Sequence, residues 1–323
     1  MNLAFGSVHI GFNDLLSVLW PTGTTTGNYS VIIMEYRLPQ VLTAMSVGAG
    51  LSIAGLLLQT VFRNPLAGPS VLGISAGASL GVALVIMAGS ALGIDLLKEH
   101  FIISDMSIVV AAFAGALFVL SLIMYVSGKI GNVVTVLIIG IMLGYLVSAT
   151  VGILQYFSGR EELQAFVLWG LGSFAKNSLD RSIWILATTF LIVMATFPLA
   201  TPLNAMLLGE NYARSLGFNI KKYNTVILLT AGLLIALGTA FTGPIAFLGL
   251  AVPHIARAVL RSADHKILIP VTLLAGVDFA LLSNLLSRLP GFDISLPVNA
   301  VTSLIGAPMV IWVIVKRSKI KVN

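Results

Sequence analysis

The chain has 323 residues, of which 58% are hydrophobic and only 9% are charged, with a formal net charge of +6. A soluble domain carries charge on roughly a quarter of its residues, so this composition excludes one and indicates an all-α polytopic membrane protein. The absence of cysteine excludes disulfides, thiolate metal sites and cysteine nucleophiles. No basic run is interleaved with aromatic residues, so the positive charge does not indicate a nucleic-acid partner.

Apolar segments of span length follow one another along most of the chain. We expect nine of them, at 41–60, 73–92, 108–126, 133–157, 183–200, 226–242, 245–260, 267–286 and 298–315. Residues 1–36 lack the pattern of a signal peptide and are expected to form an outer-side N-terminal segment. The transmembrane domain then covers 37–316, and 317–323 form a tail.

The distribution of basic residues predicts the orientation in the membrane. With nine spans the two chain ends lie on opposite sides, and the positive-inside rule places the Lys- and Arg-rich tail in the cytoplasm. Twelve of the 18 Lys and Arg residues then fall on the side of the tail and six on the other. We therefore expect an outer N-terminus, a cytoplasmic C-terminus and a cytoplasmic segment at 203–223.

Residues 208–223, LGENYARSLGFNIKKY, are polar although the sequence on either side is apolar. Glu210 and Arg214 are four positions apart with the acid first, which favours an ion pair on a helix. An apolar stripe on the same turns is formed by Leu208, Tyr212 and Leu216. The pattern predicts a short amphipathic helix outside the bilayer, which is either a solvated connection or a docking surface for a soluble partner.

The fourth span carries small residues at every fourth position, at Gly140, Gly144, Ser148 and Gly152. Such a stripe lets helix backbones approach closely. It is explained either by packing within the subunit or by the lining of a transport pathway. Residues 163–175 are apolar but too short to span the membrane, and we expect a re-entrant or interfacial helix there on the outer side.

Catalytic and metal-binding patterns are absent from the sequence. There is no G-x-x-x-x-G-K-[ST] phosphate-binding motif, the four histidines have no metal-site spacing, and no nucleophile triad is legible. His254 is expected to be a structural residue. We expect no catalytic residue, no metal ligand and no cofactor on this chain, which cannot hydrolyse ATP through such a motif.

Asp278 falls inside the eighth span, where a charge costs at least ~2.5 kcal/mol at the centre of an isolated helix. It is either a proton or ligand relay, or a carboxyl that is protonated or hydrogen-bonded within the protein, for instance through Ser283 or Asn284. The second interpretation is slightly favoured.

Four motifs resemble one known family. They are RNPLAGPSVLGISAGA at 63–78, LGENYARSLGF at 208–218, GPIAFLGLAVPHIAR at 243–257 and PVNAVTSLIGAP at 297–308. In this order they are similar to the FecCD-type permeases, the membrane subunits of type II ABC importers for ferric siderophores, haem and cobalamin. The resemblance extends from about residue 7 to residue 316.

The resemblance implies a set of partners. It implies a second permease subunit, and an identical copy, which gives a homodimer, is the first expectation. It also implies two cytoplasmic ATP-binding subunits that hold ATP and Mg²⁺, and a periplasmic or lipid-anchored substrate-binding protein. All would assemble at a bacterial cytoplasmic (inner) membrane, in contact with its lipid.

The resemblance also implies roles for individual residues. Those of the ATPase-docking segment are Leu208, Glu210, Tyr212, Arg214 and Leu216. Arg37 and Arg288 stand where family members dock the substrate-binding protein, and Gly140, Gly144 and Ser148 lie on the helix that lines the family pathway.

Three departures from the family pattern accompany the match. The family usually has ten spans, and the first has no counterpart before residue 7. Gln40 stands in RLPQ where the family commonly has a second arginine, and Asn284 stands where it often has aspartate.

The leading hypothesis is therefore the permease of an ATP-driven importer of an iron complex, a ferric siderophore first, then haem or cobalamin, which works by alternating access at a two-fold interface. A proton-coupled secondary transporter that uses Asp278 is the rival, and an assembly subunit without a pathway of its own is a further alternative.

Overall fold

The computed structural model describes residues 1–5, 10–19, 28–88, 101–130, 132–288 and 295–320, which form helices and turns without a strand. Its first half contains α1 (Phe12–Leu19), α2 (Asn28–Val31), η1 (Ile32–Arg37), α3 (Leu38–Val61), η2 (Pro69–Leu72), α4 (Ile74–Ala83), η3 (Leu84–Ala88), α6 (Phe101–Lys129) and α7 (Val133–Phe157). Its second half contains α8 (Arg160–Gly170), α9 (Leu179–Met194), η4 (Phe197–Leu199), α10 (Ala200–Leu207), α11 (Glu210–Ser215), α12 (Ile220–Thr242), α13 (Leu248–Leu260), α14 (His265–Ser287) and α15 (Val298–Ile320).

The expected all-α polytopic fold is confirmed. Six helices are long and apolar enough to cross a membrane, and three shorter apolar helices, at Ile74–Met87, Leu248–Leu260 and Val298–Val313, complete the expected series among the described residues. Parts of three expected segments lie outside the described residues: 6–9 and 20–27 of the N-terminal segment, 89–92 of the second span and 321–323 of the tail.

The first span is longer than the sequence predicted. A continuous helix of α2, η1 and α3 begins at Asn28 and ends at Val61, so it starts inside the segment expected to lie outside the membrane. Pro39 lies in the first turn of α3, just after the π-helix η1 ends, and the first turn of an α-helix is where the missing N–H group of proline is tolerated.

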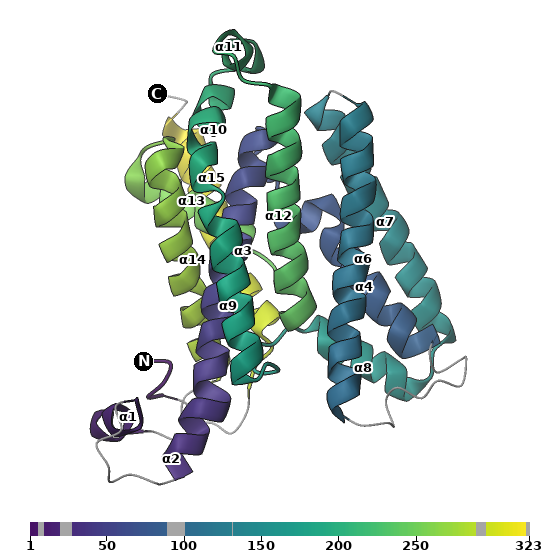
Figure 1. Ribbon diagram of the computed structural model, residues 1–323, viewed down its shortest axis with the longest axis vertical. Coiled ribbons are helices and arrows are strands. Elements are labelled where there is room, and N and C mark those ends of the chain that lie inside the picture. Colours follow the sequence, from purple (N-terminus) through teal and green to yellow (C-terminus); the bar gives the residue numbers. More distant parts are fainter. Residues whose placement is uncertain (6–9, 20–27, 89–100, 131, 289–294, 321–323) are drawn as a thin grey trace.

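α3 is the central helix of the bundle and is buried along nearly its whole length. It packs against α9, α12, α13 and α14. α12 contacts both α3 and α6, and α6 in turn packs on α4 and α7 (Figure 1). The molecule is therefore one bundle in which α12 joins the group around α3 to the group around α6.

Two glycines allow the neighbours of α3 to reach its backbone. A Cβ atom added at Gly55 would overlap the backbone of Gly249 in α13, and one added at Gly48 would overlap the carbonyl oxygen of Gly276 in α14. Helices without a water-driven hydrophobic force between them rely on such close packing. These two contacts therefore set how closely α13 and α14 approach α3.

The bundle has two distinct ends (Figure 1). The segment that contains α11 stands at one, together with α10 and the end of α15, and we name it the α11 end. The opposite end carries α1, α2 and α8, and we name it the α8 end. The N-terminus lies at the α8 end, whereas the last described helix, α15, ends at the α11 end.

Replacement of Gly55 by alanine tests the close packing. The added methyl group meets backbone rather than a movable side chain, so we expect Gly55→Ala to lower the free energy of unfolding by about 1–3 kcal/mol, as overpacked cores do. Gly128→Ala in α6 is the matched control, since nothing lies within 4 Å of a Cβ atom there. Thermal unfolding of the two purified variants checks this, and equal stability would contradict the packing argument.

Candidate functional site

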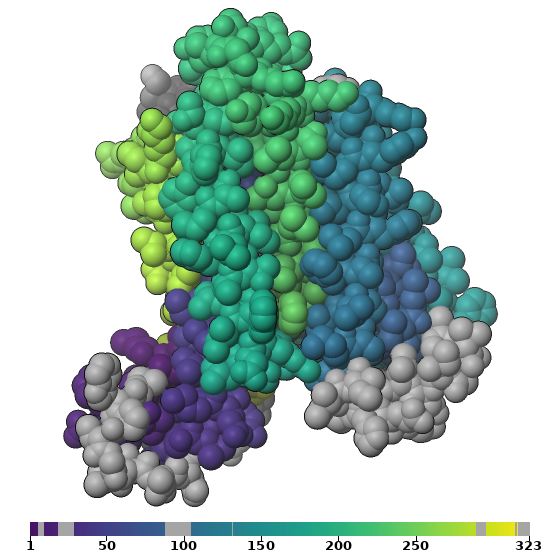
Figure 2. All heavy atoms as spheres, viewed as in Figure 1, coloured from purple at the N-terminus to yellow at the C-terminus, as the bar shows by residue number. Residues whose placement is uncertain are grey.

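The polar segment at 208–223 contains a shorter helix than expected. α11 covers only Glu210–Ser215, between Gly209 at φ +125° and Gly217 at φ +85°, two backbone conformations that favour glycine. Lys221, Lys222 and Tyr223 belong instead to the first turns of α12, which begins at Ile220. The segment projects beyond the rest of the bundle, as Figure 2 shows in the green atoms at the α11 end.

The five residues expected to dock an ATPase lie on or beside α11. The apolar ones are exposed, with 70% of Leu208, 47% of Tyr212 and 54% of Leu216 accessible. Glu210 and Arg214 form the predicted ion pair, with 3.8 Å between the carboxylate Oε2 and the guanidinium Nη2. Ala213 is fully buried and attaches the helix to the bundle. An apolar stripe that remains exposed at a polar end is typical of a surface that a partner covers.

Beneath this projection α10 is tied to α14 by polar groups that the sequence analysis missed. The Asn204 amide donates to the Asp264 carboxylate at 2.6 Å, and its own oxygen accepts from the backbone N–H of His265 at 2.8 Å. The buried His265 ring is also 2.9 Å from the Thr60 hydroxyl of α3. The three contacts join α10, α14 and α3, and we call Asn204, Asp264 and His265 the α10–α14 clasp.

The clasp has an electrostatic consequence at its carboxyl group. The Lys266 backbone N–H, and then the Asn204 amide, donate to Asp264 and hold the pKa of its carboxyl below the usual value. Because Asp264 is also the N-cap of α14, the cap and the clasp persist together as the pH falls through the ordinary carboxyl range.

His254 lies near the same end and has the structural role that the sequence predicted. It is 2% exposed, and its Nε2 is 2.8 Å from the carbonyl oxygen of Pro65. In the next turn of α13, Arg257 donates to the side-chain oxygen of Gln59 in α3.

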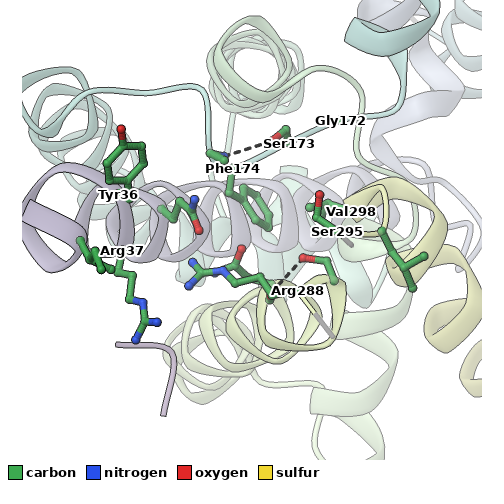
Figure 3. Close-up of a pocket in the computed structure, with 14 residues that line it drawn as sticks. Tyr36, Arg37, Gly172, Ser173, Phe174, Arg288, Ser295 and Val298 are labelled. Carbon is green, nitrogen blue, oxygen red and sulfur yellow. Dashed lines mark hydrogen bonds between the residues drawn. The ribbon is translucent and has the colours of Figure 1, made fainter. Parts of the chain in front are cut away.

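At the α8 end a cavity of about 360 Å³ brings together the two arginines expected to dock a binding protein. Arg37 is the last residue of η1, just before α3, and Arg288 directly follows α14 (Figure 3). Gln40 and Asn284, the two departures from the family pattern, line the same cavity, and so does the buried Phe174.

The two arginines differ in how far they are accessible. Arg37 is only 5% exposed, and its Nη1 donates to the carbonyl oxygens of Leu3 and Ala4 at 2.6 and 3.0 Å. This position departs from the expectation of a docking residue at the surface, because Arg37 in this conformation holds the N-terminal residues. A partner's acid could reach it only after those residues moved.

Arg288 is the better placed of the two for an incoming anion. Its Nη1 donates to the Asn2 carbonyl oxygen at 3.3 Å, whereas its Nε and Nη2 are buried with no hydrogen-bond partner among the described residues. Burial, and then the charge of Arg37, lowers the pKa of Arg288 to about 10, so the guanidinium is still charged at neutral pH. Asn2 completes the arrangement, since its side chain binds Asn284 and the Leu281 carbonyl oxygen.

The expected pathway residues on α7 fall into two environments. Gly140 is buried against Leu72, and Gly144 lies against the backbone of Gly73, so both pack on the turn from η2 to α4. Ser148 is exposed on the same helix. The close contacts explain the glycines by packing within the subunit, and the pathway role of all three stays a prediction.

Asp278 is exposed on α14 and forms no hydrogen bond or ion pair among the described residues. The suggested bonds to Ser283 and Asn284 are not formed. The Asn284 amide donates to Asn2, and the Ser283 hydroxyl is buried without a partner in the part of the chain that the structure describes.

Apolar helices with polar groups concentrated at both ends of the bundle are the architecture of a polytopic helical membrane protein. The model of the FecCD transport family matches residues 1–316, and the chain therefore belongs to this family of permease subunits of type II ABC importers. The resemblance noted in the sequence motifs is confirmed.

Individual relatives match over nearly the whole chain. The hemin transport system permease protein HmuU of Yersinia pestis is 36% identical, over 98% of this chain and 92% of the relative. The molybdate import system permease protein MolB of Haemophilus influenzae is 32% identical, over 96% and 89%. Among solved structures, an inward-facing ABC transporter of the metal-chelate type has a TM-score of 0.80 at 30% identity, with 91% of each chain covered.

Replacement of Asn204 by alanine tests the α10–α14 clasp. Hydrogen bonds to charged groups contribute about 1.5–3 kcal/mol, so we expect the amides of α10 to exchange with solvent at least about tenfold faster in Asn204→Ala. Hydrogen exchange followed by mass spectrometry measures this. Thr201→Ala, at an exposed position of the same helix, is the control, and equal exchange in the two variants would show that the clasp does not hold α10.

Proposed function

We propose that this chain is the membrane-spanning subunit of an ATP-driven importer that carries an iron complex, a ferric siderophore first, then haem or cobalamin. Two copies would pack about a two-fold axis, two ATP-binding subunits would dock at the α11 end, and a substrate-binding protein would dock at the α8 end. The observation that carries the proposal is the exposed apolar stripe of Leu208, Tyr212 and Leu216 around the Glu210–Arg214 pair.

The α11 segment has the properties of a coupling element. It projects from the bundle, exposes apolar groups to the aqueous side and is tied to α14 through the clasp. The ion pair is exposed and contributes only about 0.3–0.5 kcal/mol to the helix, so its stabilising effect does not explain why the two charges stand there. A soluble partner with a groove for the apolar stripe would use them to set its orientation.

The cavity at the α8 end supports a docking role for Arg288. Two buried N–H donors without partners are costly, and a carboxylate would satisfy both in a bidentate pair. A carboxylate side chain of a substrate-binding protein has the right charge and shape. Arg37 would contribute its charge at longer range while it holds Leu3 and Ala4.

Transport itself would require the subunit interface to open alternately to the two sides. α7 presents a broad exposed face that includes Ser148, Tyr145 and Ile153, and such a face needs cover from a second subunit or from lipid. Ser148 is the member of the expected pathway set that is free to line a passage at a two-fold interface.

The proposed substrate, an iron complex, rests on the similarity to relatives whose names state what they carry. The name of HmuU, which is 36% identical, gives hemin as its substrate, and the name of MolB, which is 32% identical, gives molybdate. Relatives of similar identity are thus named for a large iron chelate and for a small oxyanion. The stronger hemin match and the metal-chelate transporter of similar fold support an iron complex. Uptake of labelled ferric siderophore, haem and cobalamin by the assembled transporter would separate these candidates.

The ATPase partner can be tested by purification of this chain with its nucleotide-binding subunit. We expect the native pair to stay assembled and the double variant Glu210→Ala, Arg214→Ala to lose assembly or to uncouple ATP hydrolysis from uptake. Loss of the exposed ion pair alone leaves the fold intact, so the effect would report the interface.

Lys266→Gln provides the control for charge at the α11 end, since Lys266 is exposed but lies at the start of α14. If the double variant assembles and couples like the native chain and the control, α11 is not the docking element.

A second variant tests the rival, a proton-coupled secondary transporter. In an ATP-driven importer Asp278 carries no protons, so Asp278→Asn should leave ATP-driven uptake and its pH dependence unchanged. The measurement is uptake into proteoliposomes with ATP inside and with an imposed proton gradient. Uptake that follows the gradient and disappears in Asp278→Asn would favour the rival.

A further inference from the structure

A second, smaller cavity lies at the α11 end of the bundle, and apart from Arg214 none of its lining residues has a role in the function proposed above. It has a volume of about 150 Å³ and is enclosed by the end of α6, the start of α7, α11 and the start of α12. Two cations, Arg214 and Lys221, stand at it, and apolar side chains, among them Val136, Ile220 and Leu228, form its wall. Polar and apolar groups thus face one another across a small space.

The cavity also contains a buried polar group whose hydrogen bonding is incomplete. Asn224 is 8% exposed, and its Oδ1 has no hydrogen-bond partner among the described residues. An unsatisfied buried acceptor costs about 1–3 kcal/mol, so such groups in native proteins usually meet a ligand or a water molecule. The Asn224 side chain lines the cavity, and a bound group with a hydroxyl could donate to it.

The charge at the cavity is positive. Arg214 shares its charge with Glu210 at 3.8 Å, whereas Lys221 is exposed and has no ion-pair partner in the described part of the chain. Glu210 is not among the residues that line the cavity. The net field in the cavity therefore favours an anion.

The position of the cavity identifies the source of that anion. α6 ends at Lys129, α7 begins at Val133 and α12 begins at Ile220, so the cavity lies where three membrane-spanning helices meet the aqueous phase. The same helices also carry exposed apolar side chains near these ends, Val134 and Ile138 on α7 and Leu229 on α12. Phospholipid headgroups are located at this level, and basic pockets between helices bind anionic ones.

We propose that this cavity binds the headgroup of an anionic phospholipid that carries a free hydroxyl, with the phosphate between Arg214 and Lys221 and the hydroxyl donating to Asn224. The acyl chains extend from the headgroup into the surrounding bilayer. At about 150 Å³ the cavity is smaller than the roughly 300–1,000 Å³ of pockets that enclose whole ligands, so it holds a headgroup and leaves the chains in the bilayer. Free inorganic phosphate offers the same phosphate group as the lipid headgroup, and the experiment below distinguishes the two ligands.

The test uses the purified, delipidated chain and phosphatidylglycerol as the probe. Native mass spectrometry measures lipid binding for the native chain and for Lys221→Gln, which removes one cation from the cavity. A basic residue near the headgroup contributes about a fivefold change in affinity, so we expect phosphatidylglycerol to bind about fivefold more weakly to Lys221→Gln. Lys222→Gln is the matched control, since Lys222 is the exposed neighbour that does not line the cavity.

Three further measurements decide the chemistry. Phosphatidylcholine should bind less well than phosphatidylglycerol, and millimolar inorganic phosphate should not displace the lipid. Asn224→Leu should abolish the rise in melting temperature that phosphatidylglycerol gives the native chain, while the variant without lipid stays at least as stable as the native chain.

Several outcomes would overturn the proposal. Equal weakening by Lys221→Gln and Lys222→Gln would show diffuse surface attraction instead of a site. Displacement by inorganic phosphate would make it a site for the free anion, and equal binding of phosphatidylcholine would remove the role of charge. Full stabilisation of Asn224→Leu by phosphatidylglycerol would exclude the amide from the site. None of these results depends on the cargo or the ATPase partner.

Discussion

The approach of neighbouring backbones to α3 is the constraint on which the rest of the structure depends. In a bilayer, side chains gain little by leaving lipid, so helices associate through close packing and a few polar contacts. Gly55 and Gly48 provide that packing in the middle of α3, and Thr60 and Arg37 provide polar contacts near its ends. Both candidate sites are therefore joined to α3, the cavity at the α8 end through Gln40 and the α11 segment through the contact between Thr60 and the clasp.

Much of the fold could be predicted from the sequence, because a span is a local property of about 20 apolar residues. The limits of the spans were harder to predict. The π-helix η1 carries the first span past Glu35 and Pro39, and the residues after Gly217 that looked like part of a surface helix begin α12. In both places the helix extends beyond the apolar segment. Polar residues mark the end of that segment, but they do not end the helix.

The sites were predicted unequally for a related reason. The α11 residues could be found because their spacing on one short helix determines a shared face, and the ion pair is local. The bonds of Arg37 to Leu3 and Ala4 and the contact between Asn204 and Asp264 join residues far apart in the chain, so no local pattern records them. Only Asp264, placed just before an apolar run, carried a signal, that of a helix N-cap.

The two glycines that flank α11 have a mechanical consequence. Gly209 and Gly217 stand on either side of the six-residue α11, so a displacement of α11 would be transmitted to the bundle through the segments that precede and follow it. The preceding helix is α10, which the Asn204 contact connects to α14 and so to α3. The following helix is α12, which packs against α6. A displacement of α11 would therefore act on both the group of helices around α3 and the group around α6, and it could move the two groups relative to each other.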